Sequence, residues 1–291
     1  MIRFIITTAT ALCLSFPLFA QEEKSTNDKP EKEEKHVLMV GKTDTTKKDG
    51  SYLSVGSGGI KVSSKKIDSI NELRKVKVHF LMFDLGINAL HDQTNYGSSA
   101  AQQYLQVGGD KKNSNLFSLR QGKSINVNIW PVLLDFRLLK SRNQKISLYT
   151  GAGLQLYNFK FNKDISYLNE TSPMVIEDSV KFSKNKLAFA YVSVPLMLNF
   201  KTRLAGKFWV TYGVGVIGGY CFDSWTKQIS DERGKQKNHD QFNFQKFNLN
   251  LSGEIGINGY IRFYGTYQVT NMYQNALSQN PYCIGIRFFG I

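Results

Sequence analysis

Hydrophobic and polar residues alternate along most of the chain after residue 78, in segments of about ten to sixteen residues. In the clearest segment, Ile146–Tyr157, most even-numbered positions are apolar, while the odd-numbered positions are Ser, Tyr, Gly and Gln. A period of two places alternate side chains on opposite faces of a β-strand. The pattern therefore predicts long strands, each with one apolar and one polar face.

Eight such segments follow one another, which is the even number that a closed antiparallel barrel of hairpins requires. In the second segment the alternation changes parity around Pro131, where we expect a β-bulge. The predicted strands lie near residues 80–89, 125–138, 146–159, 187–201, 207–222, 244–257, 260–269 and 282–289.

The connections between these segments alternate between long and short. Three are long, the next-to-last is a two-residue hairpin turn at Asn258-Gly259, and the last is of medium length. Membrane barrels show this alternation because outer loops are free to grow while periplasmic turns stay tight. The long connections are Leu90–Gly122, Asn162–Lys186 and Asp223–Asn243; the other short ones are Lys140–Lys145 and Thr202–Gly206; the medium one is Thr270–Asn280.

Charge content separates a membrane barrel from a secreted lipocalin-like or sandwich protein. Three predicted strands, Ile146–Phe159, Leu187–Phe200 and Phe208–Phe222, contain no Asp, Glu, Lys or Arg on either face. A water-exposed sheet surface of that size would carry several charges. We therefore expect an eight-stranded antiparallel up-and-down transmembrane β-barrel, all-β, with its apolar face toward lipid. Aromatic residues available for its interfacial girdles are Phe208, Tyr220, Phe222, Phe263, Tyr267, Tyr282 and Phe288.

Outward apolar faces place the few strand charges inside the barrel, where they must be paired. We predict a lumen ion-pair network of Asp84, Glu254, Arg262 and Arg287, with barrel stabilisation as its role in preference to a proton or ion relay. Eight strands leave room for side chains but not for a water-filled channel, so a general porin is not expected. Further charges predicted to point inward are Asp135, Arg137, Lys207 and Lys246.

The N-terminal region divides into two parts. Residues 1–20 have one cation, an apolar stretch and a terminal Ala20, and predict a secretory signal peptide. Residues 21–77 are rich in Lys, Glu, Asp and Thr and predict a mostly disordered periplasmic stalk, with a short strand at Tyr52–Val55 and a short helix at Ile67–Arg74. Residues 78–291 form the predicted barrel domain.

Several short motifs within the barrel domain resemble the PorT-like outer-membrane β-barrel family. They are FDLGIN (residues 83–88), GKSINVNIWP (122–131), LYTGAGLQLYNFKF (148–161), KLAFAYVSVPLMLNF (186–200) and IGIRFF (284–289). The resemblance implies insertion by the barrel assembly machinery and, for some members, an accessory role in protein secretion. One departure is the C-terminus, which ends in Gly290 and Ile291 instead of an aromatic residue.

Candidate chemistry is sparse. His91-Asp92 and His239-Asp240 are the only base-like pairs, and both fall on connections that we expect to be mobile. No metal-ligand spacing or phosphate-binding loop is present, so we predict no enzyme activity, cofactor or metal. Cys221 and Cys283 both have inward parity, and we expect them to remain unpaired. Asn169 begins a glycosylation sequon too short to rely on.

The sequence thus predicts a non-enzymatic Gram-negative outer-membrane barrel with a structural or interaction role and both termini in the periplasm. One alternative is an accessory component of a secretion or surface-assembly complex that docks a periplasmic protein through the stalk. A second is an outer-membrane lipid-modifying enzyme that uses His91 or His239. Of the net charge of +14, residues 79–291 contribute +10, mostly in connections and strand ends. We expect this positively charged protein to contact outer-membrane lipid and lipopolysaccharide, but not nucleic acid.

Overall fold

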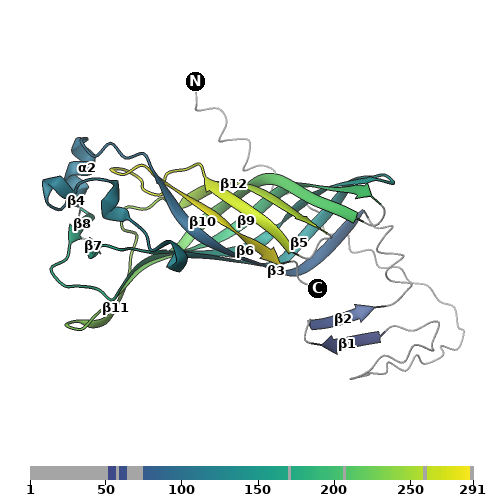
Figure 1. Ribbon diagram of the computed structural model, residues 1–291, viewed down its shortest axis with the longest axis horizontal. Coiled ribbons are helices and arrows are strands. Elements are labelled where there is room, and N and C mark those ends of the chain that lie inside the picture. The colour runs from purple at the N-terminus through teal and green to yellow at the C-terminus, as the bar shows by residue number, and fades with distance from the viewer. Residues whose placement is uncertain are drawn as a thin grey trace, which may run out of the picture. The chain divides into compact units, whose positions relative to one another are not determined.

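The computed structural model describes residues 75–169, 172–205, 208–257 and 261–288, together with the backbone of a small hairpin (Figure 1). This hairpin pairs β1 (Tyr52–Gly56) with β2 (Gly59–Ser63), so the short strand expected at Tyr52–Val55 is present. The predicted signal peptide, most of the predicted stalk and the expected helix at Ile67–Arg74 lie outside the described residues.

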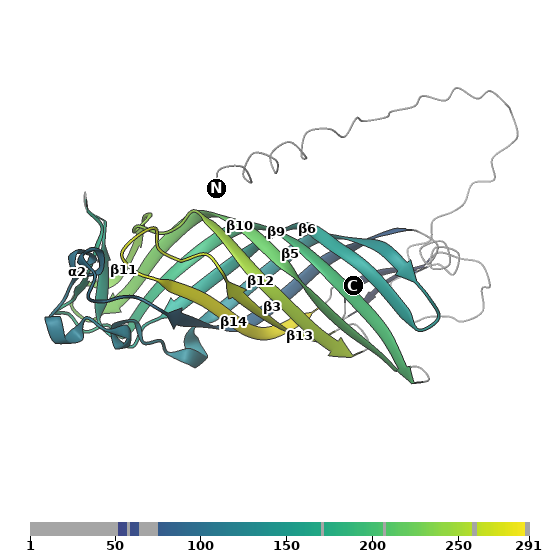
Figure 2. The same cartoon turned by 90° about the horizontal axis from the view of Figure 1, so that it is seen from above.

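Eight long antiparallel strands form a closed ring, which confirms the predicted fold class. Each strand of the ring pairs with the next ring strand along the chain, and the last strand pairs with the first. The ring therefore has no free edge (Figure 2). The strands are β3 (Val76–Asp92), β5 (Ile125–Lys140), β6 (Gln144–Lys160), β9 (Lys184–Ala205), β10 (Phe208–Ser230), β12 (Phe247–Ile257), β13 (Ile261–Gln268) and β14 (Gln279–Phe288).

The outer face of this ring is apolar on every strand. Glycines and polar or charged residues occupy most inward positions between these outward residues. The alternation predicted from the sequence therefore holds around the whole ring. Representative exposed residues, in strand order, are Leu85, Val132, Leu154, Val194, Val214, Leu251, Phe263 and Ile284.

The parity change expected at Pro131 is present, and a second one lies beside it. The register between β5 and β6 shifts between Ile129 and Val132, as a bulge requires. On β3, Leu81 adopts a positive φ of 53°, so both Phe80 and Leu81 face outward. The two-residue alternation of residues 80–89 predicts Phe80 on the inner face with Met82 and Asp84, and this prediction was wrong. The bulge on β5 is matched by a backbone irregularity on β3 that a period-two pattern does not reveal.

Two barrel strands are much longer than the sequence predicted. β10 continues to Ser230 instead of ending near Phe222, and it folds back into β11 (Gly234–His239). β9 follows β10 along this whole length, from Ala205 to Lys184. As a result β9, β10 and β11 form a three-stranded extension that rises beyond the end of β12.

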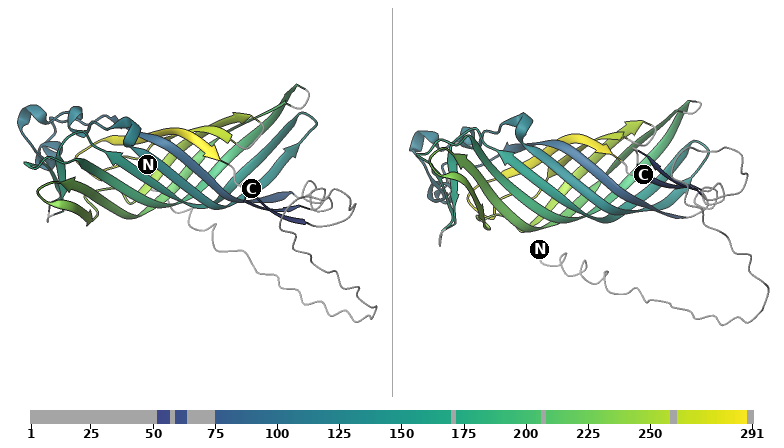
Figure 3. Two further views of the ribbon diagram at one scale, coloured as in Figure 1. Left: turned by 60° about the horizontal axis from the view of Figure 1, so that its bottom comes forward. Right: turned by 90° about the horizontal axis from the view of Figure 1, so that it is seen from below.

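The remaining long connections carry regular structure of their own, so the expectation of mobile loops was wrong for these segments. A small sheet joins β4 (Leu105–Gln106), β8 (Met174–Glu177) and β7 (Ile165–Leu168). The first connection adds α2 (Ser99–Tyr104) and the 3-10 helices η1 (Gly109–Lys111), η2 (Ser114–Phe117) and η3 (Gln121–Lys123). These elements gather at one end of the barrel, and we call them, with β11 and the β13–β14 connection, the cap (Figure 3).

No helix among the described residues is long and apolar enough to cross a membrane.

Candidate functional site

The four charged residues predicted for the lumen are in direct contact. Arg287 on β14 donates from Nε to Asp84 Oδ1 at 2.7 Å and from Nη2 to Asp84 Oδ2 at 2.9 Å. Its remaining nitrogen, Nη1, donates to Glu254 on β12, and Glu254 also accepts from Arg262 on β13. All four side chains are almost fully buried. Two carboxylates therefore balance two guanidinium groups inside the barrel.

A second layer of contacts fixes the position of Asp84. The indole of Trp130 donates to Asp84 Oδ2 at 2.9 Å, and the amide of Asn128 donates to the same oxygen at 3.1 Å. The guanidinium of Arg287 lies 5.3 Å from the ring centroid of Tyr264, whose hydroxyl donates to Asn126. The charges are thus held by polar side chains of β5 and β13, as a buried ionic network requires.

Glycines make room for this layer. Gly86 and Gly285 are paired across β3 and β14, beside Tyr264. A Cβ on Gly285 would lie 2.3 Å from the carbonyl oxygen of Leu85 and 2.5 Å from the Cα of Gly86. The strands and the tyrosine ring can approach this closely only because both positions lack a side chain.

Of the other four charges predicted to point inward, one is buried, one is half-buried, one is exposed and one lies outside the described residues. Asp135 is buried and lies 3.5 Å from the Nε2 atom of His79, and Arg137 is half-buried near the short-turn end. Lys246 is exposed, which corrects its predicted inward position, because it precedes the first residue of β12 and lies at the rim. Lys207 lies outside the described residues.

Above the lumen, the cap has an aromatic core built on the inner face of the β9–β10 extension. Phe244 lies at its centre, with its ring 4.6 Å from that of Phe189 and 4.9 Å from that of Tyr273. Neighbouring buried side chains come from all three long connections and from the connection before β14. They include Ala101, Tyr104, Leu116, Phe117, Ile165, Tyr167, Val175, Phe242, Met272 and Leu277.

Hydrogen bonds fasten the cap to the barrel strands. The Asn185 amide on β9 donates to the carbonyl of Ile165 at 2.7 Å, and the Gln228 amide on β10 donates to the same carbonyl at 3.1 Å. Within the core, the hydroxyls of Tyr167 and Tyr273 are 2.9 Å apart. Burial raises the pKa of both phenols, so they remain protonated and share this bond. The cap is therefore a folded extension of the barrel.

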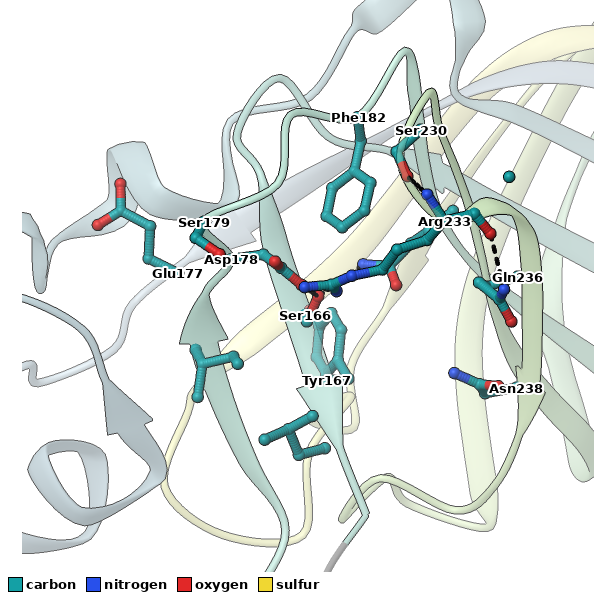
Figure 4. Close-up of a pocket in the computed structure, with 14 residues that line it drawn as sticks. Ser166, Tyr167, Glu177, Asp178, Ser179, Phe182, Ser230, Arg233, Gln236 and Asn238 are labelled. Atoms are coloured by element: carbon teal, nitrogen blue, oxygen red, sulfur yellow. Dashed lines mark hydrogen bonds and ion pairs between the residues drawn. The ribbon is translucent and has the colours of Figure 1, made fainter.

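An open cleft of about 380 Å³ lies between the β7–β8 pair and the β10–β11 hairpin (Figure 4). Arg233 extends from the hairpin into this cleft and donates to Asp178 Oδ2 at 2.9 Å. Burial raises the pKa of Asp178, but hydrogen bonds from the Val180 amide and the Ser166 hydroxyl, together with Arg233, outweigh it, so the net pKa lies below its ordinary value. The ion pair thus bridges two separate connections.

The histidines of the two candidate base-like pairs have other partners in the structure. His91 lies on β3 and shares a 3.0 Å hydrogen bond with the Tyr267 hydroxyl. His239 lies on β11, stacks on Trp225 and contacts Asp223 at 2.9 Å. His91 and Asp92 are consecutive residues of β3 and therefore point to opposite faces, whereas Asp240 follows the last residue of β11.

Cys221 and Cys283 are both free cysteines, as expected. Within the part of the chain that the structure describes, no group of His, Cys, Asp and Glu side chains is arranged to hold a metal ion.

Sequence reasoning missed the cap, although one signal was available. Long loops of a polar, mobile kind do not concentrate aromatic residues, yet Tyr104, Tyr167, Phe242 and Tyr273 all fall in connections. Aromatic residues bury large surfaces and indicate a packed core. Their density in these connections could have predicted folded loops.

No family model matches the sequence, and no curated protein sequence matches it. One similar solved structure is Ail, the attachment invasion locus protein of Yersinia pestis, at 7% identity and a TM-score of 0.28. The match covers 72% of this chain and 98% of Ail, and a likeness this low supports no inference about function.

Proposed function

We propose that this protein is a non-enzymatic integral outer-membrane β-barrel whose cap faces the cell exterior and serves as an interaction surface. The lumen is filled by side chains and does not conduct solutes as a general porin does. We place both termini on the periplasmic side, because β3 begins and β14 ends at the end of the barrel that carries the short turns.

One observation carries the proposed location. Every strand of the ring exposes large apolar side chains, among them Phe263 and Ile284, which are 64% and 67% exposed. An antiparallel sheet facing water would place polar residues at these positions. A lipid bilayer is the environment in which a complete apolar outer surface of this kind is stable. A closed barrel also satisfies its backbone hydrogen bonds without water, as a bilayer requires.

Two observations support a closed lumen. An eight-stranded ring encloses space only for side chains. Here that space holds the ion-pair network and the fully buried Trp130, with Gln155 and Ser193 bonded to each other further up. The network therefore stabilises the barrel, and a continuous aqueous path through it is not proposed.

The folded cap supports an interaction role. Binding surfaces gain affinity when their elements are already ordered, because less conformational entropy is lost on association. The aromatic core of the cap supplies that order, together with the Asp178–Arg233 ion pair across the cleft between the β7–β8 pair and the β10–β11 hairpin. Loops without such a core would meet a partner at greater entropic cost.

The PorT-like motifs favour a more specific version, in which the protein is an accessory component of a secretion or surface-assembly complex. Residues 21–77 would then dock a periplasmic protein. Deleting these residues tests this role: loss of a co-purifying partner with normal barrel insertion would support it, and unchanged co-purification would exclude docking through this segment.

The proposed location is tested by fractionating cells and comparing boiled with unboiled samples on a gel. We expect the protein in the outer-membrane fraction, with a folded band that migrates differently from the boiled band. A soluble fraction with no shift would contradict the proposal. The absence of enzyme activity is tested by lipid analysis of a deletion strain, in which an altered lipid A structure would contradict it.

A further inference from the structure

The outer wall of the β9–β10–β11 extension carries a row of lysines that the cross-strand register aligns. Lys160 on β6 is opposite Lys186 on β9, Lys186 is opposite Lys227 on β10, and Lys227 is opposite Lys237 on β11. Residues directly opposite each other in a sheet share a face. One lysine from each of four adjacent strands therefore projects from the same side. We call this set the lysine row.

A second row of the same sign lies beside the first, toward the tip of the hairpin. Ile229 is opposite both Lys184 and Lys235, which share the face of the lysine row. The charges of Lys184, Lys235 and Lys237 act on Lys227, and those of Arg120, Lys123 and Lys184 act on Lys160. The positive surface thus continues along the wall from η3 to β11.

This arrangement is unfavourable for the protein alone. Like charges directly opposite each other destabilise a sheet, and three such pairs occur consecutively. Among the nearby carboxylates, Asp223 shares this face of β10 but contacts His239, and Asp231 and Glu232 lie in the turn beyond Ile229. A bound anion would remove this repulsion.

The face that carries the lysine row is the lipid-facing one. On β9, Asn185 and Leu187 point into the cap, so Lys184 and Lys186 point away from it. The same outer face continues along β9 through Ala188, Val192, Leu196 and Phe200, without a charge. At about 3.3 Å per residue and a tilt of about 45°, these twelve or so residues span about 28 Å, close to the apolar band of about 25 Å in outer-membrane barrels. On β9 the lysine row begins directly where this band ends, and on β10 Asp223 and Trp225 lie between the two.

Trp225 marks the boundary between the two regions. It lies on β10 next to the lysine row, with the Lys237 ammonium 4.8 Å and the Lys186 ammonium 5.9 Å from its ring. Tryptophan is enriched where lipid tails meet headgroups, because its ring is apolar and its N–H is polar. Lys186 also donates to Asn158 at 2.7 Å, which holds its ammonium at this level.

From this geometry we propose that the lysine row is a binding site for the phosphates of an outer-leaflet glycolipid of the lipid A class. The acyl chains of that lipid lie along the apolar wall of β9 and β10, and its phosphates contact Lys186, Lys227 and Lys237. The proposal rests on the outer-membrane location proposed above. A soluble polyanion would bind to the lysine charges alone. The lysines lie at the edge of an apolar wall that can contact acyl chains, which favours a lipid as the ligand.

The test uses the full chain, purified and folded in detergent, with lipid A carrying two phosphates and lipid A from which both have been removed. The variant combines Lys186→Gln, Lys227→Gln and Lys237→Gln. A matched control removes three exposed lysines elsewhere, by Lys140→Gln, Lys163→Gln and Lys181→Gln. Native mass spectrometry measures the bound lipid, and the boiled-versus-unboiled gel shift checks the fold of each sample.

We expect the lysine-row variant to bind phosphorylated lipid A at least about tenfold more weakly than the original chain. The control variant should bind as the original chain does. Removing the phosphates from the lipid should weaken its binding to the original chain by a similar factor. Equal binding by variant and control, or no dependence on phosphate, would overturn the proposal while a normal gel shift left the barrel proposal intact. Displacement of lipid A by a short heparin chain at equal concentration would also overturn it, in favour of a soluble polyanion. Absence of the gel shift in the original chain would instead contradict the proposed barrel.

Discussion

Arg287 and Asp84 form a two-point ion pair between the last and the first strand of the barrel, across 203 residues of sequence. The strands β14 and β3 close the ring, and their backbone register places Arg287 directly opposite Asp84. The pair therefore joins the ring at its closing seam, where both partners are buried, Arg287 also contacts Glu254, and Asp84 also accepts from Trp130 and Asn128.

Removing Asp84 leaves Glu254 as the one carboxylate for the two buried guanidinium groups of Arg262 and Arg287, so one buried positive charge is no longer balanced. We expect Asp84→Asn to destabilise the folded barrel by about 3 kcal/mol, since breaking a buried ion pair typically costs about 3–5 kcal/mol. Urea titration in lipid vesicles measures this change. Arg142→Gln, in an exposed short turn, serves as the control and should change stability by less than about 0.5 kcal/mol. Equal stability of Asp84→Asn and the control would contradict the structural role of the network.

Close packing at the seam gives a second prediction. Gly285→Ala should destabilise the barrel by about 1–3 kcal/mol, because the added methyl group would overlap backbone atoms of Leu85 and Gly86. Gly253→Ala is the matched control on β12, where the nearest atom is 3.9 Å from the added Cβ. The same urea titration compares the two variants. Similar losses from both would mean that the effect belongs to glycine in a strand and not to the seam.

The aromatic core of the cap gives a third prediction. Phe244→Ala should destabilise the cap by about 3–5 kcal/mol, because it leaves a cavity between Phe189, Tyr167 and Tyr273. The barrel itself should keep its gel shift. Limited proteolysis should then cut the long connections in the variant but not in Phe222→Ala, which removes an exposed outer ring. Unchanged protection of the cap in Phe244→Ala would contradict the packed core.

Asp178 gives the cap a dependence on pH. Its pKa is lowered in the folded protein, so the Asp178–Arg233 contact contributes its full stability above the unfolded carboxyl pKa of about 3.9 and loses it as the pH falls further, through the folded pKa. We expect faster hydrogen exchange in β7 and β8 below about pH 4, after correction for the intrinsic exchange rate. Asp178→Asn should show the faster exchange already at neutral pH and little further change. An identical pH profile in both proteins would exclude Asp178 as the titrating group.

The sequence predicted the barrel because each strand repeats a two-residue pattern over most of its membrane-crossing part. That pattern was enough to place Asp84, Glu254, Arg262 and Arg287 on the inner faces. It was not enough for Phe80, whose direction depends on the backbone conformation of Leu81. Local irregularities of this kind arise from pairing with a neighbouring strand, and the neighbour is distant in sequence.

The cap and the lysine row could not be predicted in the same way. The cap core joins Tyr104 to Phe242, across 138 residues, through a hydrogen bond that only the folded connections create. The lysine row depends on β10 extending to Ser230, whereas the apolar alternation ends near Phe222 and placed Lys227 in a loop. Beyond Phe222, β9, β10 and β11 are held by backbone pairing with one another and by packing against the aromatic core of the cap. Neither of these interactions is visible in the hydrophobic pattern of the sequence.

In the proposed topology, the barrel crosses the outer membrane and its cap lies outside the cell. Labelling single cysteines on intact cells with a membrane-impermeant maleimide tests it most directly, in a chain that also carries Cys221→Ser and Cys283→Ser. Asn115→Cys lies on the exposed surface of the cap, and Arg142→Cys lies in the short turn between β5 and β6. We predict that intact cells label position 115 alone, and that position 142 is labelled only after the outer membrane is permeabilised. Labelling of position 142 and not 115 on intact cells, or equal labelling of both in a soluble fraction, would contradict this topology.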